Sequence, residues 1–411
     1  MSMTTSRLTF DPDGDLLLRL TYTVAKEKER EDNATGDSPV PSNISSPLGL
    51  FTNLKLAPIR DGHSMDEDEE EEVTWEVEML VSAKHLMLAS PVFRAMFKHS
   101  FLEGETLRST GKVEVSLPDD DTTAMEIVLN IIHGRVRQVP KEVTMDVMTA
   151  LSILVDKYQM HEVVELYVEI WMVRLKASVP KFFSPELYKW LSVAWVFKLP
   201  QEFKHLTWIA VRESCGSNSI MQLPPDPSLP IPEVVLGEIE EQRRKSISDT
   251  LSIITILKDK LTAPSPGTIW ARPEAARVCT STFGSIDIDN KRYSCEGMIL
   301  GTLLKGLSDQ RLWPPPSNPY RAFSFKSIAL AVRSLKITSL CDTIQNAPAF
   351  KTPAGFTFGS SVSSMQHQAH GQLKWVHDQV DQIESRIMGL DLEIFTGKGQ
   401  SALAQSTEAE S

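Results

Sequence analysis

The stretch from Ser82 to Phe97, SAKHLMLASPVFRAMF, places the strongest local limits on how this chain can fold. Four of its residues follow one another at spacings of four, three and four, which puts them on one face of a helix: Leu86, Ser90, Phe93 and Phe97. Pro91 stands inside this run, where it lacks the backbone N–H that a continuous helix would use. The pattern therefore predicts a kinked helix or two short helices, capped by Ser82, with a buried common face.

Strands and helices are expected around this stretch in an α+β order. Residues 7–24 predict a β-hairpin, because Asp11 to Gly14 supply turn residues between segments rich in Leu, Thr and Tyr. Alternation of apolar and polar residues predicts strands at 73–79 and 112–117. Periodic apolar residues predict helices ending at Gly134 and spanning two later ranges, 144–158 and 161–176. A small sheet packed on a helical cluster is the expected fold of this part.

The C-terminal half is expected to be mainly α-helical. Composition and periodicity predict an α+β domain at 7–176 with a disordered acidic insertion at 26–70. A helical extension at 177–262 and a mixed helical region with cysteines at 263–350 are expected to follow. The last segments are predicted to be a flexible link at 351–364, a heptad helix at 365–396 and a disordered tail at 397–411. The 365–396 helix is predicted from apolar residues that alternate at spacings of three and four, as in a coiled coil: Leu373, Val376, Val380, Ile383, Ile387, Leu390 and Ile394. Three heptads alone are marginal in water, so this helix needs a partner in its own chain or in a second chain.

Composition limits the classes of partner. The formal net charge of −12 disfavours a broad nucleic-acid surface. No run approaches the roughly 20 apolar residues that span a bilayer, and the first residues do not form a signal peptide. With four widely spaced cysteines we expect no disulfide framework and an intracellular protein, cytoplasmic or nuclear.

The sequence lacks several common motifs of catalysis and nucleotide binding. The sequence has no GxxxxGK[ST], GxSxG or HExxH, so we expect a non-enzymatic protein without a cofactor. Cys279, Cys295 and Cys341 could in principle bind zinc together with His367 or His370. Structural zinc sites usually bring two ligands within two to four residues, whereas 15 and 45 residues separate these cysteines. Buried thiols and no metal are therefore the expectation, with a zinc-binding or catalytic C-terminal half as the alternative.

Three separated pieces of the sequence resemble the BTB/POZ domain. They are Gly14-Asp15, the pattern Leu86-x-x-x-Ser90-x-x-Phe93-x-x-Met96-Phe97, and Asp156-Lys157-Tyr158 before another helix. The resemblance covers about residues 7–176 and implies that the five residues of the second pattern form the core of the motif. The C-terminal half looks like that of fungal BTB-domain proteins of unassigned function, in WLSVAWVF and CEGMILGTLLKGL.

The resemblance implies that the chain binds other proteins as a scaffold or adaptor. Some family members recruit a cullin-type ubiquitin-ligase scaffold through an apolar residue, any residue and a glutamate just after this helix, a pattern that Phe101-Leu102-Glu103 fits. The alternative is a buried Phe101 beside a solvated Glu103. The resemblance leaves self-association open, although only seven residues precede Leu8, too few for an exchanged N-terminal helix. Where many members carry a histidine and a basic residue this chain has Ser82 and Ala83, which leaves Lys84 as the candidate charged partner of Asp15.

Overall fold

The computed structural model describes residues 4–25, 72–98, 101–216, 226–265, 269, 277–281, 287–345 and 368–396. The predicted acidic insertion at 26–70, the link at 351–364 and the tail at 397–411 lie outside these residues. The chain divides into two compact units, Met1–Leu88 with Phe93–Arg135, and Ala89–Val92 with Val136–Ser411. Each unit is described by itself.

The first unit is built on a four-stranded mixed sheet with the strand order β1-β3-β2-β4. Its strands are β1 (Thr4–Thr9), β2 (Leu16–Ala25), β3 (Glu72–Val81) and β4 (Val113–Ser116). The strand β3 pairs with β1 in parallel and with β2 in antiparallel, and β2 pairs with β4 in parallel. The observed sheet and the helical remainder of the chain confirm the predicted α+β class.

The buried face of the sheet follows from the alternation of leucines in β2. Leu18 lies opposite Met79, and Leu20 lies opposite Val77 on β3. Residues directly opposite in an antiparallel pair point to the same face of the sheet, and these four side chains are all buried. A shift of one residue would turn both leucines to solvent, so burial specifies the register.

The predicted β-hairpin over residues 7–24 is wrong. The turn does form, since Gly14 N–H donates to the Asp11 carbonyl oxygen at 3.1 Å, but β1 and β2 do not pair because β3 lies between them. At Gly14 the chain passes close to the end of β3, where a Cβ atom would lie 2.7 Å from the carbonyl oxygen of Val81. Glycine is therefore required for the crossing itself as well as for the turn.

Four short helices accompany the strands, in the ranges α1 (Ala83–Ala89), α2 (Pro91–Lys98), α3 (Leu102–Thr110) and α4 (Thr122–Ile132). The prediction of two short helices joined at Pro91 is confirmed: α1 ends at Ala89 and Pro91 begins α2, where its missing N–H is not needed. Asp121 caps the beginning of helix α4, because its carboxylate accepts a hydrogen bond from Ala124 N–H at 2.8 Å.

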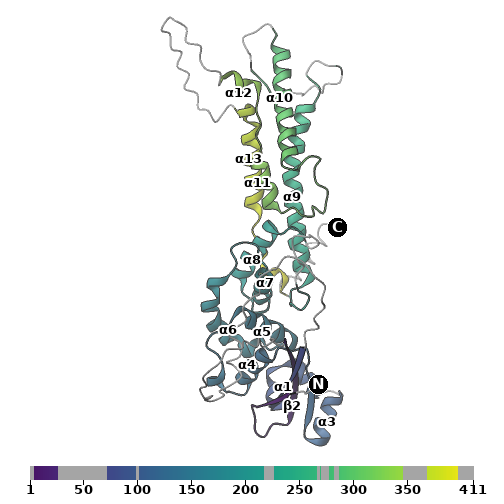
Figure 1. Ribbon diagram of the computed structural model, residues 1–411, viewed down its shortest axis with the longest axis vertical. Coiled ribbons are helices and arrows are strands. Elements are labelled where there is room, and N and C mark those ends of the chain that lie inside the picture. The colour runs from purple at the N-terminus through teal and green to yellow at the C-terminus, as the bar shows by residue number, and fades with distance from the viewer. Residues whose placement is uncertain are drawn as a thin grey trace, which may run out of the picture. The chain divides into compact units, whose positions relative to one another are not determined.

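Helices are the regular secondary structure of the second unit within its described residues (Figure 1). Its first helices are α5 (Met145–Tyr158), α6 (His161–Leu175), α7 (Glu186–Val196) and α8 (Pro200–Glu213). They are followed by α9 (Glu233–Thr262), α10 (Ile288–Asp309), α11 (Phe325–Arg333), α12 (Leu340–Gln345), α13 (Gln372–Arg386) and α14 (Leu392–Phe395). Short 3₁₀ turns lie at η2 (Val136–Gln138), η3 (Lys176–Ser178) and η4 (Gln368–Gly371).

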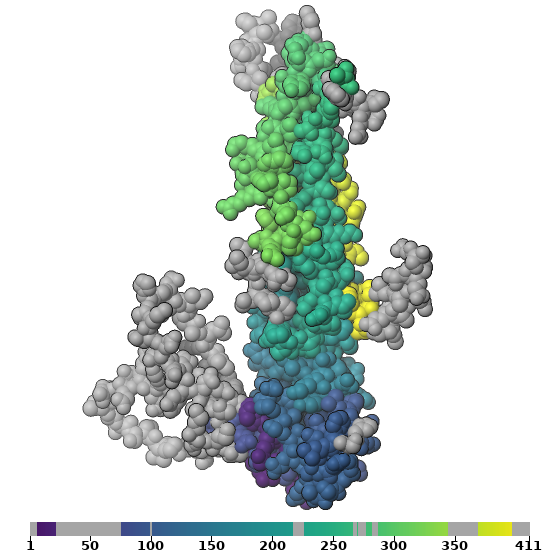
Figure 2. Space-filling model, turned by 90° about the vertical axis from the view of Figure 1, so that its right-hand side faces the viewer, coloured from purple at the N-terminus to yellow at the C-terminus, as the bar shows by residue number. Residues whose placement is uncertain are grey.

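The long helix α9 is the centre of a helical bundle, which Figure 1 shows with α10, α11 and α13 beside it. Figure 2 shows α9 in teal-green, with the yellow residues of α13 along one side and the light green residues that follow α10 along the other. Leu257 and Ile247 of α9 and Leu303 of α10 are buried in this bundle. In the helices before it, the aromatic side chains of Trp190 and Phe203 are both fully buried.

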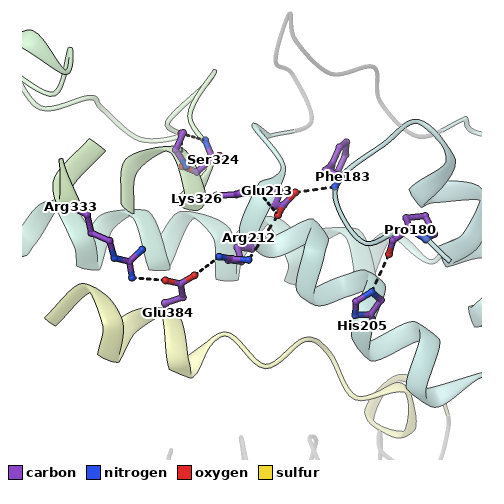
Figure 3. Close-up of polar contacts among 10 residues, drawn as sticks. Pro180, Phe183, His205, Arg212, Glu213, Ser324, Lys326, Arg333 and Glu384 are labelled. Carbon is purple, nitrogen blue, oxygen red and sulfur yellow. Dashed lines mark hydrogen bonds and ion pairs between the residues drawn. The ribbon is translucent and has the colours of Figure 1, made fainter. Parts of the chain in front are cut away.

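Charged side chains join helices of the second unit that are far apart in the sequence (Figure 3). The Glu384 carboxylate on α13 accepts hydrogen bonds from Arg212 on α8 and from Arg333 on α11, at 2.5 and 2.6 Å. Glu213 accepts from Lys326 Nζ at 2.8 Å and from Phe183 N–H at 3.0 Å. These contacts fix how α8, α11 and α13 lie against one another.

The guanidinium of Arg243 on α9 is also buried, with 1% of its side chain exposed. It forms two hydrogen bonds with Glu240, at 2.6 and 2.8 Å. It also donates to the carbonyl oxygens of Pro319 and Phe323, at 2.9 and 2.8 Å. One side chain therefore ties α9 to the segment that precedes α11.

The predicted heptad helix at 365–396 is wrong in its length. Helix α13 begins at Gln372 and ends at Arg386. Gly389 then takes a left-handed conformation (φ 75°) so close to α8 that a Cβ atom would lie 2.1 Å from the carbonyl oxygen of Lys204. Val376, Val380 and Ile383 are buried, as a helix packed on α9 requires. The partner of this helix therefore includes α9 of its own chain.

Among the described residues, the structure contains no helix both long and apolar enough to cross a membrane.

Candidate protein-interaction site

Two side chains from outside α1 satisfy the backbone at its start. Asp15 Oδ1, at the beginning of β2, accepts a hydrogen bond from Ala83 N–H at 2.7 Å. His133 Nε2, just beyond the end of α4, accepts one from Ser82 N–H at 3.1 Å. The first N–H groups of a helix have no partner within it, so these two residues complete the N-terminus of α1.

The imidazole of His133 acts as a neutral group in this position. Its Nδ1 lies 2.9 Å from the carbonyl oxygen of Leu129, which makes Nδ1 the donor and leaves Nε2 free to accept from Ser82. Burial lowers the pKa of His133 below its usual value, and the hydrogen bond to Leu129 opposes this shift only in part. The ring of His85 packs edge-on against it, at 5.1 Å between centroids.

The expected contact between Asp15 and Lys84 is replaced by backbone capping. The Asp15 carboxylate accepts from Ala83 N–H, while Lys84 is exposed on α1. The role of His133 escaped the sequence reasoning, because 51 positions separate it from Ser82 and no local pattern connects them.

The predicted docking residues Phe101, Leu102 and Glu103 lie where α3 begins. The side chains of Phe101 and Leu102 are 56% and 75% exposed, which contradicts the alternative of a buried Phe101. Glu103 lies in the first turn, where a carboxylate interacts favourably with the helix dipole. Arg108 near the end of α3 donates to the carbonyl oxygen of Phe97 at 3.1 Å and so holds this helix against α2.

A groove of about 710 Å³ runs between α3 and the ends of the strands. Three of the predicted interaction residues line it together: Asp15, Leu102 and Glu103. Charges of both signs border the groove, with Arg7 and Lys112 facing the same space as three carboxylates, those of Asp15, Glu103 and Glu114. An apolar leucine beside mixed charges suits a peptide surface better than a small apolar ligand.

The residues of the 86–97 pattern lie at their expected places. The side chains of Leu86, Phe93 and Phe97 are buried, and the last two stack at 6.1 Å between ring centroids. Ser90 is buried and donates its hydroxyl hydrogen to the Tyr158 carbonyl oxygen at 2.6 Å. Met96 is half-buried. These residues form the interior of the helices, whereas Phe101 and Leu102 face solvent and Glu103 is half-buried.

Residues 72–172 match the family model of the BTB/POZ domain. The chain therefore contains a BTB/POZ domain, which is a protein-interaction domain and which reaches from β3 to α6. No curated protein and no solved structure matches the chain. The predicted family is confirmed for these residues.

Outside this domain, three of the four cysteines lie together with a histidine. The Sγ atoms of Cys279 and Cys295 lie 3.9 and 3.8 Å from that of Cys341, and His370 Nε2 lies 3.3 Å from Cys295 Sγ. All four atoms lie within 4.8 Å of one another. No short ligand spacing indicates this cluster in the sequence, and Cys295 and His370 are 75 positions apart. His367, the other histidine considered, lies outside the described residues.

Burial is the main cause of the raised pKa values of two thiols in this cluster. It raises the pKa of Cys341 to about 12, with a further contribution from Cys295, and it raises the pKa of Cys279. Ser281 acts against both shifts, through its backbone N–H to Cys279 and its hydroxyl to Cys341. The expectation that these residues bind no metal stays a prediction.

Proposed function

We propose that this protein is an adaptor whose BTB/POZ domain docks a cullin-type ubiquitin-ligase scaffold through the beginning of α3. The single observation that carries the proposal is the exposure of Phe101 and Leu102 directly before the Glu103 carboxylate. Large apolar side chains are costly to leave in water, and a small apolar anchor beside a charge is typical of binding hot spots.

The groove supports the same location. Leu102 and Glu103 line it together with Asp15, so a partner that covers Phe101 would also meet the groove. The rigid setting of α3 favours binding without rearrangement: Arg108 holds the helix to α2, and Gly111 ends it in a left-handed conformation (φ 72°). The helical second unit is then free to hold a substrate of the ligase.

The test is a pull-down of cullin scaffolds on the full chain and on the double variant Phe101→Ala/Glu103→Lys. We expect the double variant to lose binding and to keep the melting temperature of the parent, because both side chains contact solvent. The matched control is Leu88→Ala, another exposed leucine of the same domain, which should bind normally.

Absence of cullin binding by the parent chain, or unchanged binding by the double variant, would contradict the adaptor role. The protein would then act as a scaffold without a ligase. A fall of several degrees in melting temperature would instead show that Phe101 stabilises the fold, and binding would have to be tested with Glu103→Lys alone.

A second candidate function is favoured by the cysteine cluster. In it the BTB/POZ domain serves as a targeting module for a metal-binding C-terminal half. The observation behind it is the approach of Cys279, Cys295, Cys341 and His370 to one point, and metal analysis of the purified chain tests it.

A further inference from the structure

Four potential metal ligands meet at one end of the helical bundle, and they come from four separate segments. Cys279 precedes α10, Cys295 lies within it, Cys341 lies on α12, and His370 lies on the turn before α13. In Figure 1 α12 lies where α10 and α13 have their beginnings. The cluster therefore brings together segments that are spread along the chain from Cys279 to His370.

The distances match a single tetrahedral ion. A Zn–S bond of about 2.3 Å in a tetrahedral site places two sulfur atoms about 3.8 Å apart. The two measured Sγ–Sγ distances to Cys341 are 3.8 and 3.9 Å. A disulfide would need about 2.0 Å between sulfurs, and Fe–S clusters spread their ligands over more than one iron. We propose that Cys279, Cys295, Cys341 and His370 bind one structural zinc ion.

Two carboxylates next to ligand cysteines hold the other ligand segments in place. Glu296 Oε1, adjacent to Cys295, accepts hydrogen bonds from Val278 N–H and Cys279 N–H, at 2.7 and 3.2 Å. Asp342 Oδ2, adjacent to Cys341, accepts one from Ala369 N–H at 2.8 Å, directly before His370. The ligands are thus positioned in pairs by the protein, as supporting residues do in metal sites.

Backbone conformation on the histidine side also fits a fixed ligand. Ala369, His370 and Gly371 all take left-handed conformations, with φ of 48°, 55° and 76°. Such conformations are unfavourable for residues other than glycine and persist where other contacts hold them. A metal bond to His370, together with the hydrogen bond to Asp342, would stabilise these backbone conformations.

The ligand set defines the role of the ion. Three thiols each release one proton to solvent on binding, so three thiolates and a neutral imidazole around Zn²⁺ leave one net negative charge. Four protein ligands leave no open position for substrate, so the site closes the bundle and does not catalyse.

The first experiment is metal analysis by mass spectrometry of the full chain purified without chelator. We expect about one zinc ion per chain, as for other closed four-ligand sites. We also expect its removal by a chelator to lower the melting temperature, and added zinc to restore it. Absence of zinc, together with an unchanged melting temperature on adding zinc, would overturn the proposal. Intact masses lower by the two hydrogens of a disulfide would do the same.

Single substitutions locate the ion. Cys295→Ser and His370→Ala should lose zinc, whereas the controls Cys215→Ser and His205→Ala, outside the cluster, should retain it. If either ligand variant fails to fold, Asp342→Asn takes its place. It weakens the hold on Ala369 N–H next to His370, with an expected loss of about 10-fold in zinc affinity. Full zinc retention by all cluster variants would show that the ion sits elsewhere and would overturn the assignment.

Hydrogen exchange on the same samples tests the structural role. After chelation, peptides of α10, α12 and the beginning of α13 should exchange faster, and peptides of α5 to α8 should not change. The same exchange rates in these peptides with and without zinc would contradict a zinc site that closes the bundle. These readouts do not depend on cullin binding, so the zinc site and the adaptor role can fail separately.

Discussion

The two units of this protein join their distant segments by different means. In the first unit the backbone does so, because β2 pairs with β3 along its whole length from Leu16 to Ala25. In the second unit the backbone hydrogen bonds are used up inside each helix, so side chains must join the helices. Glu384 on α13 therefore contacts Arg212 on α8 and Arg333 on α11, and Arg243 on α9 contacts the Pro319 and Phe323 carbonyl groups.

This difference has a consequence for specificity. Apolar contacts between helices permit sliding along the helix axis, whereas a buried guanidinium needs its carbonyl and carboxylate partners at one place. We therefore expect the first unit to respond most to loss of apolar volume and the second to loss of single charges.

The largest expected effect is in the apolar core of the first unit. Phe93→Ala removes a fully buried ring and should lower the free energy of unfolding by about 3–5 kcal/mol. Denaturant titration of the full chain, followed by hydrogen exchange in peptides of residues 72–135, measures it. Leu88→Ala, at an exposed leucine of the preceding helix, is the control and should change stability by less than about 0.5 kcal/mol. Equal effects of the two variants would show that the buried face of α2 is not what holds this unit.

The next effect tests the buried charge of the second unit. Arg243→Met keeps most of the side-chain volume but leaves Glu240 and two carbonyl groups without their donor, which should cost about 3 kcal/mol. The neighbouring Arg244→Met is the matched control, because Arg244 pairs with Glu241 at the surface and should contribute under about 1 kcal/mol. A tolerated Arg243→Met would mean that apolar packing alone sets the position of α9.

A smaller effect is expected at Glu384. Burial raises the pKa of its carboxyl group, but hydrogen bonds and charges from Arg333 and Arg212 outweigh burial and hold the pKa below its usual 4.5. Glu384→Gln should therefore cost about 1 kcal/mol at neutral pH, since the group is partly exposed.

The sign of the pH dependence follows from the lowered pKa. The stabilisation by Glu384 is fully present above its unfolded pKa and is lost as pH falls through the folded pKa. The parent and Glu384→Gln should thus differ at pH 7 and converge in acid, as measured by denaturation midpoints at several pH values. Glu241→Gln, at a surface pair, should change stability at pH 7 by less than Glu384→Gln does.

The smallest effect concerns His133 in the first unit. Burial holds its pKa below the unfolded value of about 6.5, so the unfolded state takes up the proton first as pH falls. Stability should therefore be unaffected above pH 7 and should decline below about 6.5. His133→Gln, whose amide oxygen can still accept from Ser82 N–H, should remove this decline, and His85→Gln should keep it. Burial also lowers the pKa of His161 in the second unit, so that unit can lose stability in acid as well. Hydrogen exchange in peptides of residues 72–135, measured at several pH values, therefore isolates the effect of His133.

Local sequence predicted the helices well where the signal is contained in one turn or one face. Pro91 determined the break between α1 and α2, and the apolar period over 144–158 predicted α5, which Thr144 caps. The exposed position of Phe101 to Glu103 could be proposed from the BTB/POZ resemblance, but only the structure decided between exposure and burial of Phe101.

Pairing between distant segments was not contained in the sequence by itself. The strand β3 lies between β1 and β2, and the turn at Asp11 to Gly14 could not exclude that insertion. Gly389 ends the apolar repeat near the Lys204 carbonyl group, a contact between residues 185 positions apart. Cys279, Cys295, Cys341 and His370 share one point for the same reason: residue types and spacings follow from the local chain, whereas the meeting of four segments depends on how the helices pack.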